Sequence, residues 1–234
     1  MNAPLLELDR VNTFYGESHA LHDVQVRVGE GEVVALLGRN GAGKSTTLKT
    51  IMGVLPPRSG SLRFGGQTLT DPTPEDLARR GVQLVPEDRR IFGGLSVEEN
   101  LVIAALSCDK PMPIDEIYRI FPRLEERRRS LGRFLSGGEQ QMLSIARAMV
   151  RKPRLLMLDE PFEGLAPIIV QALLAVVAEL ARHGQTIVIV EQNVEVCLRL
   201  AQRAYVLSNG QVVYEGRAAD LREDRETQRR YLSV

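Results

Sequence analysis

The sequence contains no tryptophan, only two cysteines and no long apolar run. Cys108 and Cys197 stand alone, without a C-x-x-C pair, so a zinc site is not indicated and the composition suits a reducing compartment. A membrane-spanning helix needs about 18 or more apolar residues. The longest candidate, residues 168–181, is shorter and is interrupted by Gln171 and Glu179. Any association with a membrane must therefore come through a partner.

The chain also lacks an excess of either charge. It has 30 Lys and Arg residues and 30 Asp and Glu residues, so no general attraction to nucleic acid or anionic lipid is expected. Residues 1–5 lack the basic and apolar regions of a signal peptide, and we expect none. The 234 residues are 44% hydrophobic, which suffices for one sizeable core. We expect residues 1–234 to form a single α/β domain with a helical insertion at about residues 96–150.

A glycine-rich segment follows a short apolar run. Residues 33–37 are typical of a buried parallel strand, and residues 38–45 match G-x-x-x-x-G-K-[ST] without a mismatch. In such a loop, backbone N–H groups and the lysine bind phosphates, and the serine hydroxyl ligates Mg²⁺. A glycine turn that binds nothing is disfavoured by the strand before it and the predicted helix after it, residues 46–52. We expect nucleotide to be held by Gly38, Arg39, Asn40, Gly41, Ala42, Gly43, Lys44, Ser45 and Thr46.

Two acidic residues follow a second apolar strand. Residues 155–158 are apolar, and Asp159 and Glu160 stand at the carboxyl end, the edge of a parallel sheet where ligands bind. We expect Asp159 to hold Mg²⁺ and Glu160 to polarise the attacking water as a general base. Two acids after a strand more often begin a helix than catalyse a reaction, so this interpretation depends on the other motifs.

A third motif begins at Ser136. Ser136 and Glu139 form a capping box, which predicts a helix through residue 149. Gly137 and Gly138 in its first turn leave N–H groups uncovered, as in an anion site. A cap that binds nothing is the usual explanation of S-x-x-E. The glycine pair argues against that explanation, because glycine destabilises a helix.

Together, residues 38–45, residues 135–141 (LSGGEQQ) and residues 155–160 (LLMLDE) resemble the ATP-binding subunit of an ABC transporter. The resemblance implies an α/β fold: a P-loop NTPase core with a mostly parallel sheet, a flanking antiparallel β subdomain and an inserted α-helical subdomain. It also implies ATP and Mg²⁺ as cofactors. In this family two chains meet face to face, and the segment Ser136, Gly137, Gly138 and Glu139 of one chain closes over the γ-phosphate held by the other.

The same resemblance assigns roles to further residues. Tyr15, before Gly16, matches the aromatic residue that stacks on adenine, although an aromatic residue near a strand end is more often part of the core. Glu87 stands where the family usually has a glutamine that contacts nucleotide and metal, which implies Ser45, Asp159 and Glu87 as metal ligands. Gln192 stands at the catalytic position usually held by histidine.

Other segments are predicted more coarsely. Residues 5–11, 22–28 and 61–64 indicate an antiparallel sheet, and residues 82–85 and 186–190 are predicted to be core strands. Residues 205–214 predict a hairpin with a type I′ Asn-Gly turn, and residues 127–129 predict a solvated helix face. His19 and His22 have no further ligand nearby, so a metal site there is not expected. The polar tail after Gly216 is too short for a regulatory domain.

The departures from the family pattern resemble one subgroup. P-E-x-R-R at residues 86–90, E-G-L-A-P at 163–167 and V-E-Q-N at 190–193 look like one of the two ATPases of branched-chain amino acid importers. Phe162 departs even from that subgroup. The resemblance implies a second, non-identical ATPase subunit, two membrane permeases and, indirectly, an extracytoplasmic substrate-binding protein. It implies a peripheral location at the cytoplasmic face of the inner membrane.

Alternatives remain open. Relatives of the subgroup import urea, amides or aromatic acids, and nothing in the sequence reports the cargo. A soluble ABC ATPase of DNA repair or translation would share these motifs but usually has two cassettes or long insertions, and a P-loop kinase would lack residues 136–141. Ile91, Phe92 and Leu95 form an apolar cluster that either contacts a permease or packs on the helical segment.

Overall fold

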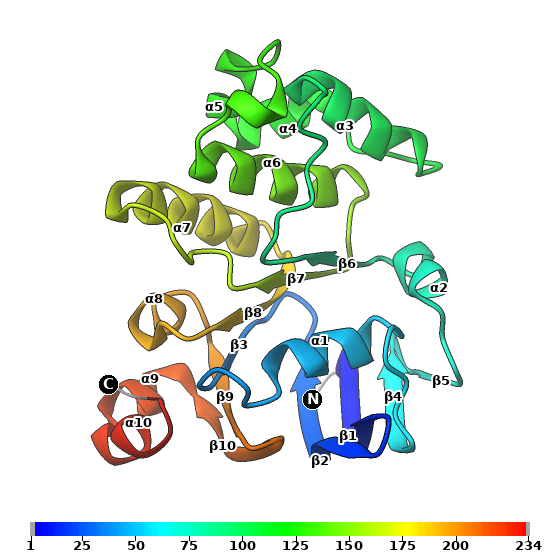
Figure 1. Cartoon of the computed structure of the whole chain (residues 1–234), viewed down its shortest axis with the longest axis vertical. Helices are drawn as coiled ribbons and strands as arrows, with labels where there is room; N and C mark the ends of the chain where they lie inside the picture. The colour runs from blue at the N-terminus through cyan, green and yellow to red at the C-terminus, as the bar shows by residue number, and fades with distance from the viewer. Residues whose placement is uncertain (1–2, 233–234) are drawn as a thin grey trace.

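A six-stranded sheet forms the centre of the molecule (Figure 1). The computed structural model describes residues 3–232. Five strands run parallel and β10 pairs antiparallel with β9, in the order β10-β9-β3-β8-β7-β6. The strands predicted at residues 33–37, 82–85, 155–158 and 186–190 are all present, which confirms the mostly parallel core. The strands are β3 (Val33–Leu37), β6 (Val82–Val85), β7 (Leu155–Asp159), β8 (Thr186–Glu191), β9 (Arg203–Ser208) and β10 (Gln211–Arg217).

A four-stranded antiparallel sheet flanks this core, in the order β2-β1-β4-β5. Buried residues alternate with more exposed ones along β1, as expected of a strand with one face on a core. The predicted antiparallel sheet is confirmed, but β1 and β2 are longer than expected and β5 was not predicted. Its strands are β1 (Leu6–Tyr15), β2 (Ser18–Val28), β4 (Ser59–Phe64) and β5 (Gln67–Leu69).

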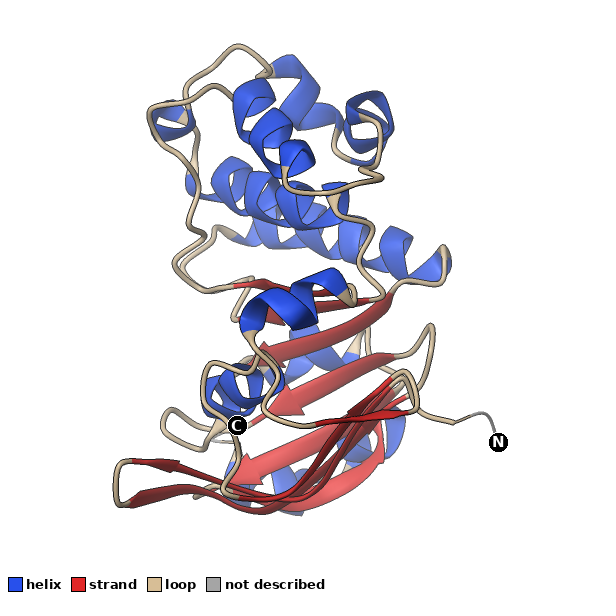
Figure 2. Cartoon of the chain, turned by 90° about the vertical axis from the view of Figure 1, so that its right-hand side faces the viewer, coloured by secondary structure: helices blue, strands red, loops and turns tan. Residues whose placement is uncertain are grey.

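Helices gather at the end of the molecule away from the antiparallel sheet (Figures 1 and 2). Capping boxes at Ser96 and Ser136 begin α3 and α6, as the sequence predicted. Leu101, Phe121 and Leu143 are fully buried between these helices. The segment contains α3 (Val97–Leu106), α4 (Ile114–Ile120), α5 (Pro122–Glu126), a 3₁₀ turn (Gly132–Phe134) and α6 (Gly137–Val150).

The prediction for residues 127–129 was wrong in its secondary structure. These arginines form a turn after α5, not a helix face. Arg127 lies 3.2 Å from Glu139, and Arg128 lies 3.3 Å from Glu98. Each pair links the turn to the first turn of a neighbouring helix, so the charge run joins α5 to α6 and α3.

The other helices surround the central sheet (Figure 1). The polar tail after Gly216 is itself helical. Leu221 and Gln228 are buried in it, so the tail packs on the rest of the chain. These helices are α1 (Lys44–Ile51), α2 (Pro74–Arg79), α7 (Pro167–Arg182), α8 (Val194–Leu198), α9 (Ala218–Glu223) and α10 (Arg225–Tyr231).

Strand β3 has a hydrophobic cluster on each of its faces. Val33, Ala35 and Leu37 belong to the cluster that contains α6 and α7, whereas Val34 and Leu36 belong to the cluster shared with the antiparallel sheet. All five residues are buried. Full burial of an aliphatic side chain stabilises the fold by about 1.5–3 kcal/mol. The loop that follows β3 is therefore anchored to a fully buried strand of the sheet.

The β9–β10 hairpin also braces this loop. Asn209 (φ 48°) and Gly210 (φ 74°) both have positive φ, which confirms the predicted type I′ turn. The Gly210 amide donates to the Ala42 carbonyl over 2.9 Å, and the Gly210 carbonyl accepts from the His22 amide over 2.8 Å. A Cβ atom at position 210 would overlap the carbonyl oxygen of Ala20. Only glycine lets the hairpin touch the loop and β2 together.

We expect Gly210→Ala to lower the free energy of unfolding by about 1–3 kcal/mol, because alanine combines a strained φ with a backbone overlap. Asn209→Gly is the matched control, since glycine accepts the same turn conformation. Urea denaturation measures both. Equal midpoints for Gly210→Ala and the parent protein would contradict the argument.

Candidate functional site

The glycine-rich loop joins β3 to α1 and cradles a cavity of about 250 Å³. Gly41 (φ 77°) and Gly43 (φ 109°) have backbone conformations that side chains rarely adopt. A Cβ atom at Gly43 would also lie 2.9 Å from Leu21 Cδ2. The glycines therefore permit a tight loop whose backbone is free to approach a ligand. Residues of this loop that line the cavity are Asn40, Gly41, Gly43, Lys44, Ser45 and Thr46.

Lys44 is the buried cation of the cavity. Its side chain is 4% exposed, and its ammonium group donates to the carbonyl oxygens of Gly38 (2.9 Å) and Arg39 (3.2 Å). The same group lies 3.3 Å from Glu160 Oε1. A buried ammonium group at the start of a helix, beside a glycine loop, suits polyphosphate. The residues present therefore fit a nucleotide.

Glu160 lies at the end of β7, held from three sides. Its backbone has a φ of 47° and its amide donates to Val190 over 2.9 Å. Gln192 Nε2 donates to Glu160 Oε2 over 2.8 Å. Burial raises the pKa of Glu160, but hydrogen bonds from Glu163 and Gln192 and the nearby Lys44 charge outweigh burial and hold the pKa below its usual value. The carboxyl group is thus charged, as a general base must be.

Asp159 and Ser45 meet at the edge of the cavity. The Ser45 hydroxyl donates to Asp159 Oδ1 over 3.3 Å. Burial, opposed by that bond and reinforced by the charges of Glu160 and Glu87, raises the pKa of Asp159 to about 6. Among residues 3–232 no three His, Cys, Asp or Glu side chains form a ready metal site. A hydroxyl and one or two carboxylates suit Mg²⁺ that completes its shell with phosphate oxygens and water.

Glu87 follows β6 and is exposed at the rim of the same cavity. The structure thus brings together the loop, Glu87, Glu160 and Gln192, as the sequence predicted. Tyr15, at the end of β1, is 46% exposed and does not line this cavity. The ammonium group of Lys49, in α1, lies 5.8 Å from the centre of the Tyr15 ring. The ring is therefore close to the helix that follows the phosphate loop.

Two acidic residues of the site were not predicted. Glu163 lines the cavity, and its hydrogen bond to Glu160 together with some burial raises its pKa to about 7. Glu191 is buried and accepts from the amides of Phe162 (3.0 Å) and Gln192 (3.2 Å). Glu191 holds the turn after Glu160 beside Gln192. Both residues stand inside motifs of the sequence, but their roles depend on the β7 and β8 turns meeting in space.

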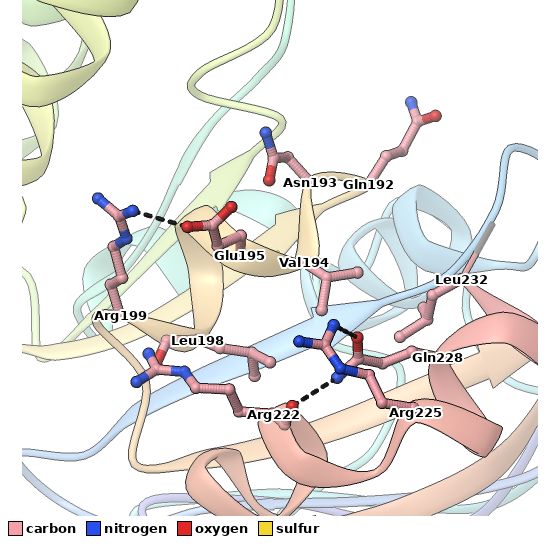
Figure 3. Close-up of a pocket in the computed structure, with 10 residues that line it drawn as sticks. All are labelled: Gln192, Asn193, Val194, Glu195, Leu198, Arg199, Arg222, Arg225, Gln228 and Leu232. Atoms are coloured by element: carbon pink, nitrogen blue, oxygen red, sulfur yellow. Dashed lines mark hydrogen bonds and ion pairs between the residues drawn. The ribbon is translucent and has the colours of Figure 1, made fainter. Parts of the chain in front are cut away.

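Gln192 lines other cavities besides that of the phosphate loop. A second cavity, of about 830 Å³, opens between α8 and the helices α9 and α10. Figure 3 shows the Gln192 side chain pointing away from Arg222 and Arg225 of this cavity. Because its amide group is bound to Glu160, Gln192 serves the cavity of the phosphate loop.

The Ser136 segment lies apart from this cavity. None of Ser136, Gly137, Gly138 and Glu139 lines it, and α6 belongs to the helical end of the molecule (Figure 1). Ser136 is exposed and forms both hydrogen bonds of the capping box with Glu139, 2.7 and 3.3 Å long. A Cβ atom at Gly138 would overlap Ile169 of α7. Packing against Ile169 therefore explains glycine at position 138 without any ligand. Only Gly137 remains as sequence evidence for an anion site at the start of α6.

Phe162 is buried in the helical core, 6% exposed, which accounts for the apolar residue at this position. Ile91 packs against the same core, and Phe92 is 44% exposed with the Arg147 guanidinium 4.6 Å from its ring centre. The cluster at residues 91–95 is therefore divided between the core and the surface. No helix of residues 3–232 is long and apolar enough to cross a bilayer.

The family model of the ABC transporter matches residues 21–163, which include the phosphate loop, the Ser136 segment and the acidic pair. The chain belongs to the ABC transporter family. As an ABC ATP-binding subunit it binds nucleotide and hydrolyses ATP.

Relatives within this family match almost the whole chain. The high-affinity branched-chain amino acid transport ATP-binding protein BraG of Pseudomonas aeruginosa is 46% identical, covering 97% of this chain and 99% of BraG. The probable branched-chain amino acid transport ATP-binding protein LivF of Archaeoglobus fulgidus is 36% identical, covering 98% and 99%. The lipopolysaccharide export system ATP-binding protein LptB of Escherichia coli is 34% identical, covering 93% and 92%.

Solved ABC cassettes share the fold. CbiO1 of Clostridium perfringens, part of the cbiONQ complex, superposes with a TM-score of 0.84 at 26% identity, covering 98% of this chain and 94% of CbiO1. A dimeric ATP-binding cassette in a post-hydrolysis state, bound to ADP and Pi, superposes with a TM-score of 0.80 at 25% identity, covering 91% and 98%. The predicted ABC ATPase fold is thereby confirmed.

The Glu163 carboxyl group gives a pH-dependent prediction. Its pKa in the folded chain, about 7, exceeds the usual 4.5, so the folded state binds more protons between these values. Stability should therefore fall as pH rises from about 4.5 to 7 in the nucleotide-free protein. Glu163→Gln removes this loss, so its melting temperature should exceed that of the parent at pH 8 and match it near pH 4.5.

Glu17→Gln is the control, because Glu17 is 98% exposed. Thermal melts without Mg²⁺ or nucleotide measure the effect. If the difference in melting temperature between Glu163→Gln and the parent does not change with pH, the raised pKa of Glu163 is wrong.

Proposed function

We propose that this chain is an ATP-hydrolysing subunit of an importer for branched-chain amino acids. One observation carries the choice of cargo: the 46% identity to BraG over 97% of the chain. Its partners would be a second, non-identical ATPase subunit, two permeases and, indirectly, an extracytoplasmic binding protein. The chain would sit at the cytoplasmic face of the membrane. Exposed apolar side chains, Phe92 and, on α3, Val102, Ile103 and Leu106, support a contact with a permease.

Uptake tests this assignment. The chain, its partner ATPase, the permeases and the binding protein would be reconstituted in vesicles that contain ATP, and uptake of labelled leucine, isoleucine and valine would be measured. Urea, an amide and an aromatic acid serve as competing cargoes. ATP-dependent leucine uptake supports the proposal. Uptake of another cargo alone, or export, would overturn the cargo while leaving the ATPase assignment intact.

The proposed mechanism begins with Lys44. In the nucleotide-free chain its ammonium group is paired with Glu160 and two loop carbonyls. Phosphate oxygens would take over these contacts, and loop amides would hold the rest of the polyphosphate. Tyr15 would stack on the adenine. Mg²⁺, held by Ser45, Asp159 and Glu87, would neutralise phosphate charge when bound.

Glu160 would then orient the attacking water and accept its proton. Gln192 holds the Glu160 carboxylate through a 2.8 Å hydrogen bond, which supports a role in orientation. Ser136, Gly137 and Gly138 would bind the γ-phosphate held by the partner chain, since their distance from their own loop leaves them free to do so. Closure of the two chains would exclude water and drive the permeases.

Replacement of Glu160 separates binding from hydrolysis. Glu160→Gln should lower ATP hydrolysis by on the order of 10²-fold or more, because the amide cannot accept a proton. It should also bind ATP at least as tightly as the parent, because Lys44 loses its competing ion pair. Lys44→Ala should weaken ATP binding by about 10–100-fold. Titration calorimetry and phosphate release measure both; a Glu160→Gln variant that still turns over near the parental rate would remove Glu160 from the base role.

Gln192 predicts an asymmetric pair of sites. Histidine can carry a charge near neutral pH, whereas glutamine offers only a neutral donor and acceptor. We expect the site built on this chain's phosphate loop to be the slower of the two in a heterodimer. In reconstituted heterodimers, removal of Glu160 should then lower total ATPase less than removal of the partner's equivalent glutamate. Gln192→His should raise the rate; equal losses from the two glutamates would refute the asymmetry.

A further inference from the structure

The loop after β6 runs along the first three turns of α6, and Arg89 lies at the point of contact. Arg89 (φ 60°) and Arg90 (φ 47°) both have positive φ. The Arg89 amide donates to Pro86 over 3.0 Å, and its carbonyl accepts from the Ser144 hydroxyl over 2.7 Å. Two consecutive non-glycine residues in this conformation are strained. The hydrogen bond from Ser144 fixes the backbone of Arg89 against α6.

The side chain of Arg89 reaches back to the beginning of α6. Its Nη1 donates to Gln140 Oε1 over 3.2 Å. A Cβ atom at Gly137 would lie 3.3 Å from Nη1 and 3.5 Å from Nη2. The guanidinium group thus lies over the glycine that begins the helix, next to the exposed Ser136. A side chain at position 137 would crowd this guanidinium group.

The charge of Arg89 has no acidic partner within residues 3–232. Its hydrogen-bond acceptor, Gln140, is neutral. The arginines around it are paired: Arg90 lies 3.0 Å from Asp88, and Arg127 lies 3.2 Å from Glu139. Arg89 is half-buried, and its guanidinium group is oriented by the hydrogen bond to Gln140 and by its place against Gly137. A pre-oriented guanidinium group beside a helix N-terminus is a donor set for phosphate.

We propose that Arg89 is an additional phosphate-binding residue of the Ser136 segment, contributing its guanidinium group to the nucleotide held by the partner's loop. This inference rests on the proposed function, in which that segment closes over the partner's nucleotide. Glu87, two residues earlier, lines the chain's own cavity. One short loop would then contact both nucleotides of the dimer. Nucleotide binding at one site would therefore affect nucleotide binding at the other.

A brace is the competing role. The Arg89–Gln140 bond could serve only to fasten the loop to α6, in which case loss of either partner would have the same effect. A phosphate-binding role depends instead on the charge of residue 89. Variants of both residues separate the two roles.

The test uses the assembled transporter in which the partner ATPase carries glutamine at the position equivalent to Glu160, so that ATP is trapped at the site to which Arg89 contributes. Labelled ATP retained after gel filtration is measured against MgATP concentration. Arg89→Gln should raise the concentration for half-maximal trapping by on the order of 10-fold, and Arg89→Lys by less. Arg90→Gln, which removes the same charge from an exposed arginine, should match the parent. Gln140→Met, which removes the contact with Arg89 and the 3.1 Å bond to the Gly132 carbonyl but leaves the charge of Arg89, should also match it.

The outcomes are distinct. If the partner's glutamate-to-glutamine variant traps no ATP when this chain is otherwise unchanged, the proposed shared site fails. If trapping occurs but Arg89→Gln matches Arg90→Gln, the role of Arg89 fails. Loss of trapping in Gln140→Met equal to that in Arg89→Gln would make Arg89 a brace. Melting temperatures of the Arg89 variants confirm folding, and Arg89→Lys keeps the test valid if Arg89→Gln is unstable.

Discussion

The ion pair between Lys44 and Glu160 is the contact on which the site depends. It joins the loop after β3 to the end of β7, two strands that flank β8 in the sheet, across 3.3 Å with both side chains almost fully buried. A buried pair is stabilising only if its remaining polar atoms are satisfied. Loop carbonyls satisfy the lysine, and Gln192 satisfies the glutamate. Phosphate can replace the carboxylate as the partner of Lys44, so arrival of nucleotide would release Glu160 toward water while the scaffold stays fixed.

The features that could be predicted from the sequence are those that depend on neighbouring residues. The β3 strand, the phosphate loop and the Asn209–Gly210 turn are encoded by adjacent residues, because their conformations depend on local sterics and backbone hydrogen bonds. The capping boxes at Ser96 and Ser136 are equally local. The family resemblance supplied the roles of residues that no local pattern could assign, such as Gln192.

What the sequence missed depends on contacts between distant segments. The pKa of Glu163 rises because its carboxyl group meets that of Glu160 in a turn whose shape Glu191 maintains. Gly138 is required by Ile169 of another helix, and Arg127 in the turn after α5 pairs with Glu139 of α6. Neither contact can be read from a window of sequence. The polar residues after Gly216 form helices because Leu221 and Gln228 are buried on the core, against the polar character of the segment.

The central claim is that Ser136 of one chain serves the phosphate loop of another. Disulfide formation tests it in the assembled transporter, with Cys108 replaced by serine and Cys197 left in place because it is buried. Ser136→Cys would be introduced in this chain, and a cysteine in the partner ATPase at the position equivalent to Asn40. The account predicts a bond between the two chains that forms with MgATP and not without nucleotide. Placing Asn40→Cys in the same chain as Ser136→Cys should give no bond within that chain. A bond within one chain, or ATP-independent bonding between chains, would contradict a site shared by two subunits.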